Sequence, residues 1–155
     1  MFNKILVPLD GSELAGKVIP QAEDLAKSFN AQLVLLTVGS AEIGESSPEA
    51  FKSEAAARLP EARYLAATTA ALQAKGLKAT WAYKQGAPAQ EIINYAIEHQ
   101  VDLIAMASHG AGEIAWLLGS VAQRVVSHAP TPVLLMRVLG PKPPEHKSEL
   151  DYFSM

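Results

Sequence analysis

The segment ILVPLDGS, residues 5–12, determines how the rest of the chain is interpreted. Its first five residues form a short apolar run, which is typical of a strand buried on both faces of a parallel sheet. The chain then turns at Asp10 and Gly11, and Ser12 is a suitable N-cap for a helix. Apolar residues follow at helical spacing as far as Phe29. The segment therefore predicts a strand, a tight turn and a helix in succession.

Apolar runs of strand length recur along the chain as far as residue 138. Four further strands are expected, at residues 33–38, 78–83, 102–107 and 131–138. The run at 78–83 alternates between apolar and polar residues, so we expect that strand near an edge of the sheet. Strands that alternate with helices predict one α/β domain, residues 1–138, whose parallel sheet carries helices on both faces.

Helical patterns separate the later strands. They are expected over residues 48–75, from Gly86-Ala87-Pro88 onward, and over residues 114–128. Pro60 should kink or split the first of these, because proline cannot donate a helical hydrogen bond. Gly76 stands where a C-terminal cap glycine belongs. Residues 39–47 are rich in glycine and serine and are expected to form a loop.

Composition excludes several classes of protein. The 155 residues carry a net charge of −3, which argues against a nucleic-acid partner. The absence of cysteine excludes disulfides and thiolate metal sites. No signal peptide precedes the first strand and no apolar run reaches membrane-spanning length, so a cytoplasmic protein with no membrane partner is expected.

Residues 139–155 form a tail rich in proline and charge, outside the alternating pattern. Two interpretations remain open. The tail is either a disordered terminus, or its apolar tip at residues 150–155 docks on a partner subunit.

A glycine-containing loop follows the fourth expected strand, with the sequence MASHGAG at residues 106–112 and LLGSV at 117–121. Glycines let the main chain approach an anion closely, and a helix N-terminus adds free N–H donors. Ser108 and Ser120 add hydroxyl groups. In open α/β sheets, ligands bind beyond the carboxyl ends of strands where the strand order reverses. If the first strand is central and the fourth lies beside it, a nucleotide-shaped crevice lies between Pro8–Asp10 and Ala107–Gly110.

Two better-known phosphate motifs do not apply. Residues 110–115, GAGEIA, formally match the dinucleotide fingerprint G-x-G-x-x-[GA]. That fingerprint needs further βα units and an acidic residue after the next strand, whereas here the next strand ends at Met136-Arg137 and the pattern stops. The P-loop motif G-x-x-x-x-G-K-[ST] is absent from the sequence.

Three stretches together resemble the universal stress protein family: KILVPLDGS at 4–12, SHG at 108–110 and LLGSVAQRVVSHAPTPVLL at 117–135. The resemblance covers residues 3–138. It implies a three-layer α/β sandwich of the adenine nucleotide alpha hydrolase type, with a five-stranded parallel sheet in the order 3-2-1-4-5. It also implies a homodimer through the fifth strand, Pro132 to Val138. One branch of the family binds ATP.

The resemblance also implies a set of nucleotide-binding residues. They are Pro8, Leu9, Asp10, Val38, Met106, Ala107, Ser108, His109, Gly110, Gly119, Ser120, Val121 and Ala122. The ATP-binding branch carries G-x2-G-x9-G-[ST], whose last three fixed positions fall here on Gly110 and Gly119-Ser120. The chain departs from it twice: Ala107 replaces the first glycine, and eight residues instead of nine separate Gly110 from Gly119.

Three functions remain open after this comparison. The first is a dimeric regulatory protein of stress response or signalling, which binds ATP or another adenine nucleotide, with or without Mg²⁺, and acts on an unknown downstream protein. The second is an ATP hydrolase of low activity, for which Asp10, His109 and Arg124 are the obvious candidates, although no nucleophile–base pair or metal-ligand spacing is evident. The third is a dimerisation module without a nucleotide, which the two departures favour. We expect the first, with no catalytic residues and no protein metal site.

Overall fold

The computed structural model describes residues 1–39, 59–110 and 118–138. Five parallel strands form one sheet in the order β3-β2-β1-β4-β5, which confirms the fold expected from the sequence. The strands are β1 (Lys4–Pro8), β2 (Gln32–Gly39), β3 (Ala79–Gln85), β4 (Leu103–Ala107) and β5 (Val133–Met136). The alternating strand β3 lies at one edge of the sheet, as predicted.

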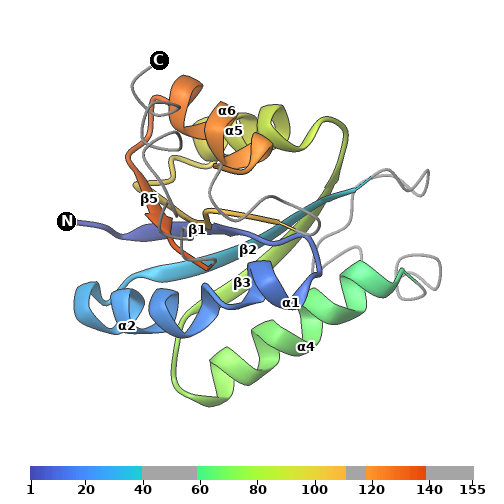
Figure 1. Ribbon diagram of the computed structural model, residues 1–155. Coiled ribbons are helices and arrows are strands. Elements are labelled where there is room, and N and C mark those ends of the chain that lie inside the picture. Colours follow the sequence, from blue (N-terminus) through green and yellow to red (C-terminus); the bar gives the residue numbers. More distant parts are fainter. Residues whose placement is uncertain (40–58, 111–117, 139–155) are drawn as a thin grey trace, which may run out of the picture.

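Helices cover both faces of the sheet and make three layers (Figure 1). One face carries α1 (Glu13–Gly16), α2 (Ile19–Phe29) and α4 (Pro60–Ala74), whereas the other carries α5 (Pro88–Glu98) and α6 (Ser120–His128). Alternate side chains along a strand therefore pack into the two hydrophobic cores, one on each face of the sheet. Ile5 and Val7 pack toward α1, α2 and α4, and Leu6 packs toward α5 and α6. In the described part of the chain, no helix is long and apolar enough to cross a bilayer.

The single helix expected after Ser12 is in fact two helices. Ser12 caps α1 as predicted, because its hydroxyl accepts the Ala15 N–H at 3.1 Å. The helix then ends at Gly16, and the Lys17 and Val18 N–H groups bond three residues back instead of four. Pro20 explains the break, since it has no N–H to donate to the Gly16 carbonyl. The prediction overlooked this proline.

The ends of the later helices and of the fifth strand differ in part from those expected from the sequence. Within the pattern expected to be helical over 48–75, Pro60 occupies the first position of α4. Residues 48–58 lie outside the described residues, as do the loop residues 40–47 and the tail 139–155. Gly76 follows the helix with φ +85°, the left-handed conformation that a C-terminal cap requires. Of the helix expected over 114–128, residues 114–117 lie outside the described residues; Leu118 and Gly119 are not helical, and α6 begins at Ser120. The fifth strand is shorter than 131–138.

Strands β1 and β4 part before their carboxyl ends. Their ladder comprises Ile5 with Leu103 and Leu6 with Ile104. On the other side of β1 the ladder with β2 continues to Pro8 opposite Leu36. Proline has no N–H for a ladder bond, and here it lies where the strand order of the sheet reverses. The parting opens a space between the two strand ends at the position where ligands bind in open α/β sheets.

Candidate functional site

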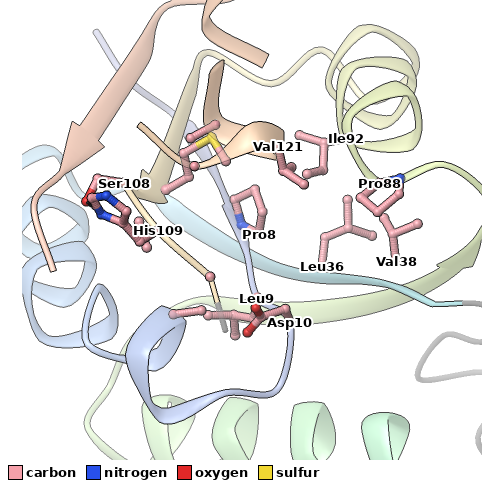
Figure 2. A pocket seen from close by; sticks show the side chains of 16 residues that line it. Pro8, Leu9, Asp10, Leu36, Val38, Pro88, Ile92, Ser108, His109 and Val121 are labelled. Carbon is pink, nitrogen blue, oxygen red and sulfur yellow. Dashed lines mark hydrogen bonds between the residues drawn. The ribbon is translucent and has the colours of Figure 1, made fainter. Parts of the chain in front are cut away.

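A cavity of about 160 Å³ lies where β1 and β4 part (Figure 2). Residues from the ends of β1, β2 and β4 and from the starts of α5 and α6 surround it. Its described lining consists of Pro8, Leu9, Asp10, Ala15, Leu36, Val38, Pro88, Ile92, Met106, Ala107, Ser108, His109, Gly110, Gly119, Val121 and Ala122. Strand ends and helix starts meet here because the fold brings both to the same edge of the sheet.

One end of the cavity is apolar. Figure 2 shows Leu36 and Val38 of β2 beside Pro88 and Ile92 of α5, away from Ser108 and His109. Leu36 and Val38 are two residues apart and so share one face of their strand. Pro88 and Ile92 are four residues apart and so share one face of their helix. This end can hold a flat apolar or aromatic group.

Asp10 is the single carboxylate in the described lining, and it stands at the turn after β1. Its Oδ1 accepts the Ser12 N–H at 2.9 Å and the Ser12 hydroxyl at 2.5 Å. These bonds fix the side chain in the turn that leads into α1. Asp10 therefore stabilises the turn through Oδ1, while Oδ2 is directed toward Gly110.

Gly110 is packed against the Asp10 carboxylate. A Cβ atom built on Gly110 would lie 2.7 Å from Asp10 Oδ2, closer than real Cβ atoms approach other groups. Glycine is therefore required here by space and not by an unusual backbone angle. The Asp10 carboxylate can lie this close to the main chain after β4 because residue 110 has no side chain.

The N-terminus of α6 provides backbone donors beside the cavity. Gly119 is the N-cap residue and supplies no side-chain cap. The first intrahelical bond runs from the Gln123 N–H to the Gly119 carbonyl. The N–H groups of Ser120, Val121 and Ala122 therefore have no partner within the helix, and the helix dipole makes this end attractive to an anion. Val121 and Ala122 line the cavity.

Ser108 and His109 lie at the polar end, opposite Val38 (Figure 2). Both are buried, and Ser108 Oγ lies 2.6 Å from His109 Nδ1. The Val138 N–H donates to the same Oγ at 3.3 Å. The Ser108 hydroxyl, expected to donate to phosphate, is thus engaged within the protein.

The structure brings together every residue of the expected binding set except Ser120. Ser120 occupies the first position of α6 and is exposed, and it is absent from the described lining. Four lining residues were not anticipated: Ala15, Leu36, Pro88 and Ile92. Arg124, a candidate for hydrolysis, lies on α6 and is not in the described lining. Within residues 1–39, 59–110 and 118–138, no three His, Cys, Asp or Glu side chains gather closely enough to hold a metal ion.

Burial raises the pKa of Tyr95 in α5 above its usual value of 10. The ring stacks on His99 with centroids 3.8 Å apart. The neutral phenol is therefore favoured in the fold. Above pH 10 the unfolded chain loses this proton first, so the contribution to stability is complete below pH 10 and declines as the pH rises through the folded-state pKa.

We expect the free energy of unfolding to fall as the pH rises above 10, and to fall less in Tyr95→Phe, which has no phenol proton to lose. Urea denaturation at several pH values measures both profiles. If the two proteins lost stability in parallel, Tyr95 would not contribute to the pH dependence of unfolding.

Comparison with known proteins establishes the family. The model of the universal stress protein family matches residues 1–137. This chain belongs to that family. Among its relatives, the universal stress protein YxiE of Bacillus subtilis is 36% identical, over 88% of this chain and 100% of YxiE. The universal stress protein MJ0531 of Methanocaldococcus jannaschii is 31% identical, over 88% of this chain and 83% of the relative.

Solved structures of universal stress proteins share the fold. The structure of MJ0577, a universal stress protein of M. jannaschii, superposes with a TM-score of 0.71 at 30% identity and covers 88% of this chain and 96% of its own. A universal stress protein in complex with cAMP gives a TM-score of 0.66 at 25% identity, over 88% of this chain and 98% of its own. The sheet of this chain is therefore that of the universal stress proteins.

Proposed function

We propose that this universal stress protein is a regulatory protein that binds an adenine nucleotide, ATP in the first place, in the cavity between β1 and β4. The observation that carries the proposal is the pairing of an apolar end with the uncapped first turn of α6 in a single cavity. A purine ring and a phosphate group need surfaces of these two kinds within one site.

The size of the cavity suits part of a purine ring and leaves the rest of a nucleotide outside it. A cavity of roughly 150 Å³ holds a benzene molecule, and this one measures about 160 Å³. The base would lie against Val38 and Ile92, and the sugar and phosphates would extend past Asp10 toward α6. Asp10 would accept a hydroxyl hydrogen of the sugar. A magnesium ion would arrive with the triphosphate, because Asp10 is the single carboxylate in the described lining.

Isothermal titration with ATP, ADP, AMP and cyclic AMP tests the proposal. We expect saturable binding, and a loss of about tenfold in affinity for Asp10→Asn, because a hydrogen bond to a charged group contributes about 1.5–3 kcal/mol. Asparagine can still accept the Ser12 bonds, so the turn should persist. Asp24→Asn, an exposed change on α2, is the control and should leave affinity unchanged. If millimolar nucleotide gives neither heat nor a thermal shift, the proposal fails.

The absence of binding would favour the alternative of a dimerisation module without a nucleotide, which Ala107 and the shortened spacing support. Slow hydrolysis is the other alternative, and phosphate release from the wild type and from Asp10→Ala separates it from binding. In this proposal the protein acts in the cytoplasm and signals to a downstream protein. It forms a homodimer through β5 and the flanking residues, Pro132 to Val138.

A further inference from the structure

Ser108 uses all its polar groups to join three elements of the fold. Its N–H donates to the Met136 carbonyl of β5 at 2.8 Å, and its own carbonyl accepts the Gly119 N–H at 3.0 Å. Its Oγ accepts the Val138 N–H at 3.3 Å and lies 2.6 Å from His109 Nδ1. The side chain has no exposed surface. One residue thus connects the end of β4, the end of β5 and the start of α6.

Three of the connected residues, Ser108, His109 and Gly119, line the cavity. Gly119 is the N-cap of α6, so its position sets where the first-turn N–H groups point. His109 lines the cavity and is itself buried. The Ser108 carbonyl alone bonds α6, through the Gly119 N–H, whereas the hydroxyl bonds Val138 and His109. The hydroxyl bonds hold residue 108 in place and so fix the position of the carbonyl that accepts the Gly119 N–H.

We propose that Ser108 is a positioning residue: it holds the N-cap of α6 and the His109 ring in the arrangement that receives the phosphates, and it does not contact the ligand itself. The proposal rests on the proposed function, and it replaces the direct phosphate contact expected from the sequence. Its physical basis is that a buried hydroxyl with two partners in the protein is poorly placed to bind a third group.

Two variants remove the same hydrogen bond from its two sides. Ser108→Ala removes the acceptor, and Val138→Pro removes the donor without changing residue 108. We expect each to weaken the binding of AMP, ADP and ATP by a similar factor, roughly three- to tenfold, which corresponds to one hydrogen bond. The double variant should be little weaker than either single variant, because both act on one interaction.

Ser28→Ala is the matched control, because the Ser28 hydroxyl bonds an exposed carbonyl within α2. It should leave affinity unchanged. If the loss in Ser108→Ala grows from AMP to ATP while Val138→Pro binds normally, Ser108 contacts phosphate and the proposal is wrong. Reduced thermal stability with unchanged affinity would equally overturn it.

Amide hydrogen exchange without ligand keeps this proposal separate from the proposed function. We expect the Gly119 and Val138 amides to exchange faster in Ser108→Ala, because the connected elements open together. Faster exchange at Val138 with unchanged exchange at Gly119 would overturn the positioning role, whether or not the wild type binds nucleotide. A wild type that binds no nucleotide but shows the coupled exchange would refute only the proposed function.

Discussion

Gly110→Ala is expected to weaken nucleotide binding by about tenfold and to lower the free energy of unfolding by about 1–3 kcal/mol, the usual cost of overpacking. The added methyl group would lie 2.7 Å from Asp10 Oδ2. Asp10 cannot easily turn away, because its other oxygen is bonded to Ser12. Either the carboxylate leaves its position or the ends of β1 and β4 move apart, and both changes alter the cavity.

The double variant Asp10→Ala/Gly110→Ala distinguishes a collision from a general effect of alanine at this position. Without the carboxylate the methyl group has room, so Gly110→Ala should cost little further stability in that background. Urea denaturation of the four proteins gives the coupling free energy, and titration calorimetry gives affinity for the two single variants. Additive losses in stability would show that Asp10 is not the obstacle.

Leu134→Glu is expected to convert the proposed homodimer into a monomer. In the described part of the chain β5 pairs with β4 alone. The carbonyls of Pro132 and Met136 accept N–H groups of residues 104 and 108. The backbone groups of Leu135, between them, therefore point to the open side of the strand. Leu134 is 39% exposed on this strand, and an open apolar edge is suited to pairing with another copy.

Leu135 is a poorer choice for this test, because it packs against the core beneath α5 and α6. A charge there would destabilise the fold and confuse the result. Ile97→Glu is the matched control, since Ile97 is an exposed apolar residue on α5. Light scattering coupled to gel filtration should give a dimer for the wild type and the control, and a monomer for Leu134→Glu. A dimeric Leu134→Glu protein would exclude this placement of the interface.

The sheet and most of the cavity were predictable because they depend on local patterns. Apolar runs gave the strands, and proline and glycine at Pro60 and Gly76 marked helix ends correctly. Pro20 predicts an interruption of the helix for the same reason as Pro60, and it therefore predicts the division between α1 and α2. Leu36 and Ile92 were also within reach. Leu36 shares a strand face with Val38, and the fold places the helix of Ile92 over that face.

The role of Ser108 could not be predicted in the same way. A serine beside glycines in a loop suggests a phosphate contact, and the residue does lie at the cavity. Its hydroxyl, however, is directed by Val138, thirty residues further along the chain. Only the three-dimensional arrangement of β4 and β5 brings those groups together, and no local pattern records it.

The central position of β1 affects how the chain folds during synthesis. Strand β1 precedes both of its neighbours in the chain, and β2 is synthesised soon after it. Its other neighbour, β4, begins about a hundred residues later, at Leu103. A nascent chain can therefore assemble β1, β2 and β3 early, but one side of β1 stays open until β4 emerges. Such late, long-range pairing slows folding and leaves an aggregation-prone edge, so we expect assistance by chaperones to matter most in this interval.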